Sequence, residues 1–314
     1  MQNNKIIIGS RASELALWQS EYVAAEIRLL QPSLTVEIKK IKTTGDIILD
    51  TPLSKIGDKG LFTKELDRAL LDGEIDLAVH SLKDVPTQLN PGLMIGAIMK
   101  REDVRDVFIS HPSKKYTSLN AVPANGTIAT GSLRRKCQLL QHRPDLNIVD
   151  IRGNLKTRKE KLEQSGWDGM LLAKAGVTRL GWTSMISEVL SATFILPAVG
   201  QGALGIQIRE IDDEIREIIS PLGHKDTEQA TIGERALLRR LEGGCQIPIG
   251  TYGRIENERF ILDAIVGSID GKRIVPGTID GAAEESEILG TKLAEDLLLR
   301  GAKEILEEIR KNAQ

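Results

Sequence analysis

The chain of 314 residues has few of the residues that mark several large classes of protein. Its two cysteines, Cys137 and Cys245, are too few for a disulfide framework and form no C-x-x-C pair. The four histidines are scattered along the sequence, so we expect no metal site. No run of about 18 apolar residues occurs, and the N-terminus has no basic segment followed by a long apolar one. These absences predict a soluble, cytoplasmic protein with no membrane partner.

Aromatic residues and net charge are also scarce. Phe, Trp and Tyr make up 3% of the chain, and 42 basic residues nearly balance 44 acidic ones, for a net charge of −2. A protein that binds nucleic acid through phosphate contacts is expected to be more basic, and one that stacks bases needs aromatic rings. We therefore expect no nucleic-acid partner, and any electrostatic function must be local.

Hydrophobic residues make up 41% of the chain, enough for the two or three domains that its length suggests. Strand-like and helix-like segments alternate from the start. Expected strands are Lys5–Gly9, Leu34–Ile41 and Asp76–His80, with a helix after the N-cap Ser13 and another near Thr63–Leu71. The first helix is indicated by apolar residues near helical spacing, namely Leu15, Trp18, Tyr22 and Leu29. This alternation predicts a doubly wound α/β sheet.

After Arg101 the same alternation starts again and predicts a second α/β domain. Its expected strands are Val107–Ser110, Thr127–Thr130, Asn147–Ile151 and Gly169–Ala173, with helices beginning at Leu133 and Leu155. Near Pro197 the pattern breaks, and Gly205–Arg209 predicts a strand that returns to the first sheet.

Beyond Pro221 the pattern changes to an α+β type. We expect a helix at Glu228–Leu241, strands at Ile255–Ser268 and Arg273–Thr278, and a long amphipathic helix from Glu284 to Lys311 that Gly290 and Gly301 interrupt. The expected domains are residues 1–100 with 200–220, residues 101–199, and residues 221–314. The predicted fold class is α/β, with two doubly wound domains and a small α+β C-terminal domain.

Positive charge gathers between Arg134 and Lys161, a stretch with nine basic residues, three acidic ones and no aromatic one. In Thr130-Gly-Ser-Leu-Arg-Arg135, hydroxyl groups and two arginines fall at an expected helix start, where the helix dipole disfavours cations. Such a charge is tolerable if an anion binds there, because backbone N–H groups and arginine forks form a receptor for carboxylate or phosphate. Arg11 stands in a similar place, between the first strand and its helix. A solvated basic surface is the alternative, chiefly for the lysines.

The segment Asp76-Leu-Ala-Val-His-Ser-Leu-Lys-Asp84 places polar residues just beyond an apolar strand. Lys83 and Asp84 follow the carboxyl end of that strand, where open α/β sheets bind their ligands. The neighbouring lysine helps to keep Asp84 ionised, which suits a group that stabilises a cation or moves a proton. The alternative is an ordinary polar turn before Pro86, and we interpret His80 as structural.

Two glycine-containing segments have simpler interpretations. Gly200-Gln-Gly-Ala-Leu-Gly205 matches G-x-G-x-x-G, but a dinucleotide-binding motif opens a helix, whereas this segment continues into an expected strand. We interpret it as a close-packed crossover between domains. The loop from Lys55 to Gly60, with Lys59 and the following Phe62, is a candidate lid, and an ordinary surface loop is the alternative.

The two cysteines stand in different settings. Cys137 lies on the apolar side of its expected helix, and we interpret it as a core thiol. Cys245 stands in Glu242-Gly-Gly-Cys-Gln-Ile-Pro-Ile-Gly250, after two glycines that leave room for a bulky group to approach its sulfur. An inert loop cysteine is the alternative.

Taken in order, these segments closely resemble the hydroxymethylbilane synthase family, whose members are also called porphobilinogen deaminases. The matching segments span nearly the whole chain, and several are specific to that family. They are Gly9–Ser13, Thr44–Asp46, Gly57–Phe62, His80–Pro86, Gly131–Arg135, Arg152–Asn154, Pro197–Gly202 and Glu242–Gly250. The resemblance implies two domains like those of periplasmic solute-binding proteins, and a small third domain that carries the cysteine.

The resemblance also implies an enzyme, a transferase of tetrapyrrole and heme biosynthesis. In the family the cysteine matching Cys245 carries a dipyrromethane cofactor through a thioether. Four porphobilinogen molecules are condensed onto this primer with loss of ammonia, and the linear tetrapyrrole hydroxymethylbilane is then released by hydrolysis. Asp84 matches the catalytic carboxylate, which stabilises the cation formed when ammonia leaves and assists proton transfer. Residues implied to bind the carboxylates of cofactor and substrate are Arg11, Ser13, Lys83, Thr130, Ser132, Arg134, Arg135, Arg152, Arg158, Arg179 and Gln201.

Two positions depart from the family pattern: Gly131 stands where serine is common, and Lys174 where a small apolar residue is common. The strongest alternative function is a two-domain solute-binding protein for small carboxylates, because the first two domains would look alike. The missing secretion signal and the domain with Cys245 disfavour this alternative. By resemblance we also expect a monomer.

Overall fold

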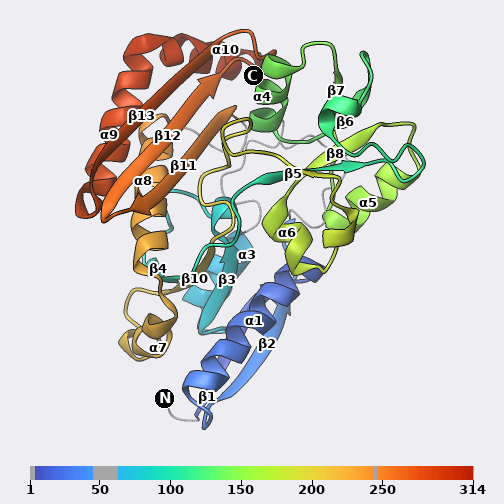
Figure 1. Cartoon of the computed structure of the whole chain (residues 1–314). Coiled ribbons are helices and arrows are strands. Elements are labelled where there is room, and N and C mark those ends of the chain that lie inside the picture. Colours follow the sequence, from blue (N-terminus) through green and yellow to red (C-terminus); the bar gives the residue numbers. More distant parts are fainter. Residues whose placement is uncertain (1–3, 45–62, 243–246, 314) are drawn as a thin grey trace. The chain divides into compact units, whose positions relative to one another are not determined.

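The structure is a computed structural model that describes residues 4–44, 63–242 and 247–313. The described part contains two five-stranded sheets and one three-stranded sheet (Figure 1). The chain divides into two compact units. Of the described residues, one unit consists of 4–44, 63–102 and 202–228, and the other of 103–201, 229–242 and 247–313. The division into three domains stays a prediction, since the second unit contains both the other five-stranded sheet and the three-stranded one.

The first unit contains a sheet with the strand order β2-β1-β3-β10-β4. β1 runs parallel to β2 and β3, and β10 runs antiparallel to β3 and β4. Its strands are β1 (Lys5–Arg11), β2 (Thr35–Ile41), β3 (Leu77–Ser81), β4 (Leu93–Ile98) and β10 (Leu204–Arg209). Its helices are α1 (Glu14–Leu30), α3 (Lys64–Leu71) and α7 (Asp213–Ile219). The predicted return of the chain to this sheet is confirmed, whereas β4 has no counterpart among the predicted strands.

Helix α1 begins after Ser13, whose side chain accepts a hydrogen bond from the backbone N–H of Ala16 at 3.3 Å, so the predicted N-cap is confirmed. The large apolar residues that indicated this helix do not form its buried face. Trp18, Tyr22 and Leu29 are 37%, 41% and 76% exposed. The face that packs on the sheet consists mainly of small and β-branched residues, including Ala16, Val23, Ala24 and Ile27, which let the helix approach the strands closely.

Several apolar clusters hold the strands of this sheet in place, and one of them contains residues of both β1 and β10. Ile6 and Ile8 of β1 and Ile206 and Ile208 of β10 are fully buried in the same cluster. Burying one such side chain contributes about 1.5–3 kcal/mol, so the central strands are firmly anchored. The carboxyl end of β3, which lies between β1 and β10, is therefore a rigid support for the residues that follow it.

The second five-stranded sheet has the order β7-β6-β8-β5-β9 and repeats the topology of the first. β6 is parallel to β7 and β8, and β5 is antiparallel to β8 and β9. In each sheet the strand that runs antiparallel to both of its neighbours, β10 or β5, is the first strand after the chain leaves the other sheet. The strands are β5 (Asp106–Ser110), β6 (Thr127–Ala129), β7 (Asn147–Val149), β8 (Gly169–Ala173) and β9 (Glu188–Val189). The helices are α4 (Leu133–His142), α5 (Leu155–Glu163) and α6 (Lys174–Arg179).

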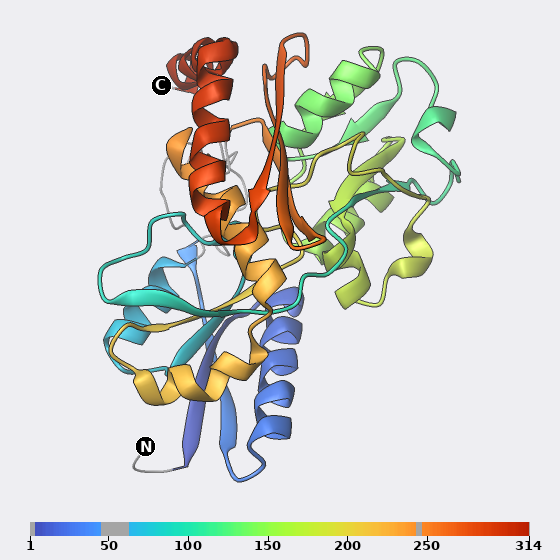
Figure 2. The same ribbon diagram turned by 60° about the vertical axis from the view of Figure 1, so that its left-hand side comes forward.

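The three-stranded antiparallel sheet has one face covered by helices (Figure 2). Its strands are β11 (Ile249–Glu256), β12 (Arg259–Gly267) and β13 (Ile274–Ala282), and the helices are α8 (Lys225–Arg240), α9 (Ser286–Leu297) and α10 (Lys303–Ala313). The prediction of one strand over Ile255–Ser268 is wrong. Asn257 and Glu258 both have positive φ, 49° and 62°, and this tight turn separates β11 from β12.

The prediction that both glycines interrupt the last helix is half correct. Gly301 has φ 107° and separates α9 from α10. Gly290 lies inside α9 without a break, and its role is packing. A Cβ atom at Gly290 would lie 2.1 Å from the backbone oxygen of Gly233 in α8, so the glycine lets the two helices touch.

The prediction that Cys137 is a core thiol is confirmed, since its side chain is fully buried. A Cβ atom at Gly267 of β12 would lie 2.2 Å from its sulfur, so α4 packs closely on the three-stranded sheet. Burial raises the pKa of Cys137 to about 12, which makes the thiol unreactive. Within the described residues, no helix combines the length and the apolar character needed to cross a bilayer.

Candidate active site

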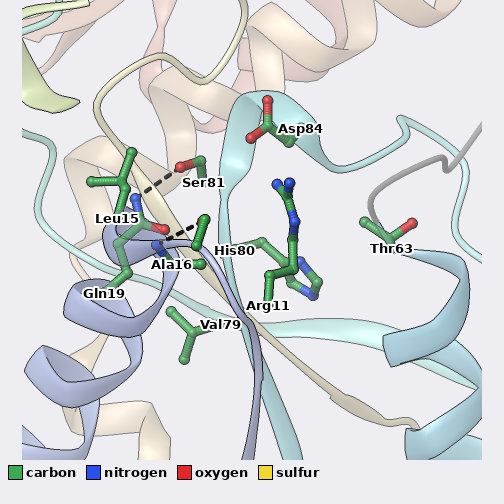
Figure 3. Close-up of a pocket in the computed structure, with 10 residues that line it drawn as sticks. Arg11, Leu15, Ala16, Gln19, Thr63, Val79, His80, Ser81 and Asp84 are labelled. Carbon is green, nitrogen blue, oxygen red and sulfur yellow. Dashed lines mark hydrogen bonds between the residues drawn. The ribbon is translucent and has the colours of Figure 1, made fainter. Parts of the chain in front are cut away.

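A small cavity lies at the carboxyl end of β3 in the first unit (Figure 3). Its volume is about 50 Å³, several times the space that one water molecule needs. The cavity brings together three residues that the sequence selected, Arg11, Ser13 and Asp84. Its lining consists of Arg11, Ser13, Leu15, Ala16, Gln19, Thr63, Val79, His80, Ser81 and Asp84.

Asp84 is positioned by the turn that follows β3. The strand ends at Ser81, and a 3₁₀ turn, η2 (Leu82–Asp84), begins directly after it, as the sequence predicts. Leu82 is 1% exposed, and its N–H donates to the backbone oxygen of Ala203 at 3.0 Å, which fixes the turn to the chain before β10. Asp84 is half-buried at the cavity, and Lys83 lies in the same turn but not in the cavity lining.

Arg11 ends β1, and Ser13 caps α1, so both come from the junction that faces the end of β3. Both Arg11 and Asp84 line the cavity, and Figure 3 shows the Arg11 guanidinium extending toward Asp84. Gln19 of α1 donates to the hydroxyl of Ser81 at 2.8 Å, which ties the helix to the strand end. A cation and a carboxylate in one cavity suit a ligand that carries both an anionic group and a hydrogen-bond donor.

His80 is the last but one residue of β3 and joins the cavity to a buried polar chain. Its Nε2 lies 2.8 Å from Oε1 of Gln207, and the Gln207 amide donates to Asp67 at 2.9 Å. Burial lowers the pKa of His80 to about 4, and the charges of Asp84 and Arg11 act on it in opposite directions. The imidazole is therefore neutral at neutral pH.

In the second unit, Arg134 and Arg135 share one carboxylate, which the sequence did not identify. Arg134 Nη1 and Arg135 Nη2 each lie 2.8 Å from an oxygen of Asp106, the first residue of β5. All three side chains are buried, with Asp106 completely so. The anion that makes two arginines tolerable at the start of α4 is thus supplied, in part, by the protein itself.

Gln201 belongs to the same cluster. Its amide donates to the backbone oxygen of Val104 at 2.7 Å and to Asp106 at 2.9 Å. Two guanidinium groups around one carboxylate leave the cluster with a net positive charge. The sequence does indicate that Asp106 is unusual, because an acidic residue at the start of a buried apolar strand needs a partner for its charge. It does not indicate which residues those partners are, because they lie far away along the chain.

Burial alone would raise the pKa of Asp106, but the charges and hydrogen bonds of Arg134 and Arg135 outweigh it and hold the pKa below its usual range. A carboxyl group whose pKa is lower in the folded state adds stability above its unfolded pKa, near 3.9, and loses that contribution as the pH falls further. Asp106 therefore stabilises the fold at neutral pH and makes it sensitive to acid.

We expect Asp106→Asn to lower the free energy of unfolding by about 3–5 kcal/mol at pH 7, because two buried cations lose their counter-charge. The difference from wild type should narrow as the pH falls below about 4. Urea unfolding at several pH values measures both effects. Asp213→Asn is the control, since Asp213 pairs with Arg216 while 81% exposed and should change stability by less than about 1 kcal/mol. Equal losses in both variants would show that the buried cluster adds nothing special.

The other selected residues of the second unit follow the carboxyl ends of its parallel strands. Thr130 follows β6 and is buried, and Ser132 caps α4. Arg152 follows β7, Arg158 lies in the first turns of α5, and Arg179 ends α6 after β8. Carboxyl ends of parallel strands meet at one edge of a sheet, so these groups share the edge at which α/β sheets bind ligands.

Both departures from the family pattern have a structural reason. A Cβ atom at Gly131 would lie 2.6 Å from the backbone oxygen of Ile151, so this backbone leaves no room for a serine without a shift. Lys174 donates to Asp103 at 2.7 Å, and Asp103 also pairs with Arg105. The lysine therefore belongs to an ion-pair network at the segment that leads into β5.

A further buried carboxylate, Glu234 of α8, was also not predicted from the sequence. Its oxygens accept hydrogen bonds from the backbone N–H groups of Gly200 and Gly253, both at 2.7 Å. It thereby ties the glycine-rich crossover segment to β11, in line with the interpretation of Gly200–Gly205 as a crossover. The segment continues into β10 rather than a helix, so the rejection of a dinucleotide motif is confirmed.

Four of the site residues predicted from the sequence lie outside the described part of the chain. Cys245, the predicted attachment point, is one of them, and the candidate lid residues Lys55, Lys59 and Phe62 are the others.

The residues of the second unit fit an anionic pyrrole cofactor such as the dipyrromethane that the resemblance implies. Among the described residues, Nε of Arg134, Nε of Arg135 and Nη1 of Arg152 are buried without a hydrogen-bond partner. Buried N–H groups of this kind are costly unless a ligand satisfies them, and carboxylate is the anion that guanidinium binds best together with phosphate. The donor set is therefore suited to carboxylate side chains.

Family models match nearly the whole chain. The model described as "Porphobilinogen deaminase, dipyromethane cofactor binding domain" matches residues 6–217, and "Porphobilinogen deaminase, C-terminal domain" matches residues 229–299. Among solved structures, the methionine-binding protein MetQ has 16% identity and a TM-score of 0.44 over 70% of this chain and 88% of its own. That similarity is too low to add to the fold described above.

Curated relatives carry the same family name. A porphobilinogen deaminase of Chlorobium phaeobacteroides is 53% identical over 311 residues, which cover 98% of both chains. One of Chloroherpeton thalassium is 53% identical over 309 residues, covering 97% of this chain and 98% of the relative. The alternative of a solute-binding protein is not favoured by these matches. The chain belongs to the porphobilinogen deaminase family, and it is a transferase of porphyrin and heme biosynthesis that uses a dipyrromethane cofactor to build hydroxymethylbilane from porphobilinogen.

Proposed function

We propose that Asp84 is the catalytic carboxylate of this enzyme and that Cys245 carries the cofactor. The observation that supports the role of Asp84 most strongly is its position in one cavity with Arg11 and Ser13, at the carboxyl end of a buried parallel strand. The turn that carries it is held by a backbone hydrogen bond, so the carboxylate is preorganised.

In this assignment Asp84 acts on porphobilinogen itself. The aminomethyl nitrogen leaves as ammonia, and the carbon left behind becomes part of a cationic methylene-pyrrole. A carboxylate beside the pyrrole N–H accepts its hydrogen bond and stabilises that positive charge, and it assists proton transfer in the same place. When bound, the dipyrromethane supplies the pyrrole carbon to which the first substrate unit is added.

We assign the binding of cofactor and substrate carboxylates to cationic, hydroxyl and amide side chains. In the first unit these are Arg11, Ser13 and Lys83. In the second unit they are Thr130, Ser132, Arg134, Arg135, Arg152, Arg158, Arg179 and Gln201. Because Asp106 neutralises part of the charge of Arg134 and Arg135, their unsatisfied Nε groups are the atoms that support this assignment.

The remaining expectations also belong to this proposal. The enzyme acts as a monomer in the cytoplasm and has no nucleic-acid partner. It consists of three domains, residues 1–100 with 200–220, residues 101–199 and residues 221–314. The three separate sheets support this division.

The carboxylate-binding role of the cavity is tested by Arg11→Gln. Loss of a charge-assisted hydrogen bond of about 1.5–3 kcal/mol should raise KM for porphobilinogen roughly 10- to 150-fold. Arg68→Gln is the matched control, because Arg68 is 84% exposed on α3 and does not line the cavity. Steady-state rates of porphobilinogen consumption measure the difference. If Arg11→Gln matches the control, the cavity does not bind substrate carboxylate.

A further inference from the structure

A series of hydrogen-bonded side chains leads from the cavity into the interior of the first unit. It consists of His80, Gln207, Asp67 and Asn90. Both oxygens of Asp67 are acceptors, one for the Gln207 amide at 2.9 Å and one for the Asn90 amide at 2.8 Å. His80, Gln207 and Asp67 are 5%, 1% and 7% exposed. Burial raises the pKa of Asp67, and its two amide hydrogen bonds oppose that effect. A buried polar chain of this kind stabilises less than apolar packing would, which points to a role in orienting a group.

This chain determines which nitrogen of His80 carries the proton. The Asp67 oxygens accept, so the Gln207 amide must turn its NH₂ group toward Asp67 and its oxygen toward His80. That oxygen can accept only from an N–H, so the proton of His80 lies on Nε2. The imidazole is neutral and has a single N–H, so Nδ1 is left as a hydrogen-bond acceptor.

Nδ1 of His80 has no hydrogen-bond partner within the part of the chain that the structure describes. His80 nevertheless lines the cavity together with Asp84 and Arg11, and Figure 3 shows its ring beside the Arg11 side chain. Besides the Arg11 cation, the cavity lining thus includes the Asp84 carboxylate and a histidine whose Nδ1 carries no proton. A ligand carboxylate is itself an acceptor and cannot form a hydrogen bond with an unprotonated ring nitrogen. A ligand N–H or ammonium group can donate a hydrogen bond to that nitrogen.

We propose that Nδ1 of His80 accepts a hydrogen bond from a nitrogen-bound hydrogen of the substrate, so that His80 is a substrate-positioning residue beside Asp84. This inference rests on the proposed function, in which porphobilinogen brings a pyrrole N–H and an aminomethyl nitrogen to the cavity. Gln207 and Asp67 hold the ring in the required tautomer. His80, interpreted as structural from the sequence, then has a binding role as well.

Two substitutions separate the binding role from a structural one. In His80→Asn the amide oxygen takes the place of Nδ1 along the side chain, so this variant retains the acceptor and loses the hydrogen bond to Gln207. In His80→Gln the amide nitrogen takes the place of Nε2, so this variant retains the hydrogen bond to Gln207 and loses the acceptor. We expect His80→Gln to have a higher unfolding temperature than His80→Asn. We nevertheless expect kcat/KM to fall on the order of tenfold in His80→Gln, and to fall several-fold less than that in His80→Asn.

Which of the two variants is the more active distinguishes a binding role of His80 from a purely structural one. If activity follows thermal stability, with His80→Gln the more active, His80 is only structural and the inference is wrong. If wild type itself does not convert porphobilinogen, the proposed function fails instead, which is a distinct result.

A spectroscopic measurement does not depend on turnover. In the full-length protein with ¹⁵N-labelled histidine, His80 should show a protonated Nε2 and an unprotonated Nδ1 at neutral pH. In an Asp84→Asn background that slows the reaction, added porphobilinogen should move the Nδ1 signal toward that of a hydrogen-bonded nitrogen. A protonated Nδ1 in the free protein, or an Nδ1 signal that saturating porphobilinogen does not move, would overturn the proposal.

Discussion

Asp84→Ala is expected to lower turnover of porphobilinogen by about 10²- to 10⁴-fold, the range typical of a lost acid–base group. The carboxylate lies in the cavity with Arg11 and Ser13, at the end of a rigid strand, and no other carboxylate lines that cavity among the described residues. The cation that forms as ammonia leaves would lose its counter-charge. The steady-state rate of porphobilinogen consumption at saturating substrate measures the effect.

The fold should survive this substitution, because Asp84 is half-buried and the turn is held by the backbone of Leu82. Circular dichroism and the unfolding temperature check that point. Asp72→Ala is the matched control, since Asp72 is 51% exposed at the end of α3 and forms an ion pair with Arg68 of that helix. Near-normal turnover in Asp84→Ala, with the control unchanged, would show that another group carries the chemistry.

Cys245→Ser is expected to abolish activity and to leave the protein without covalent cofactor. A thioether forms through a nucleophilic sulfur, and the serine oxygen is a far weaker nucleophile at neutral pH. The intact mass of the variant should therefore equal its sequence mass, while porphobilinogen consumption falls to background.

The second cysteine provides the control for this result. Cys137 is fully buried, and burial raises its pKa to about 12, so it has almost no thiolate at neutral pH. Cys137→Ser should retain the cofactor mass and the activity, although burial of the hydroxyl lowers stability. Cofactor mass that persists in Cys245→Ser would place the attachment elsewhere.

The elements of the fold were largely predictable because their signals are local. Apolar runs with β-branched residues predicted β1, β3, β5 and β8, and the apolar pattern of residues 205–209 predicted the return strand β10. The turn at Asn257 and Glu258 lacks the glycine that marks a tight turn, so the predicted strand Ile255–Ser268 ran through it and most of β11 was not predicted. Gly290 was taken for a helix break because close packing against Gly233 depends on a residue in another helix.

The site was only partly predictable because its buried partners are far apart in the sequence. Asp84 and Arg11 stand at strand ends, where a pattern reveals them. Asp106 meets Arg134 across 28 residues and Gln201 across 95, and His80 meets Gln207 across 127. Contacts at such separations follow from the topology of the sheets, and no spacing in a single sequence encodes them.

The most direct test of covalent cofactor attachment is the intact mass of the purified wild-type protein under denaturing conditions, followed by peptide mapping. The expected result is an excess over the sequence mass that equals two linked porphobilinogen-derived units and maps to the peptide containing Cys245. A bare sequence mass that incubation with porphobilinogen or hydroxymethylbilane leaves unchanged would contradict the assignment of Cys245, and with it the proposed use of a covalent primer.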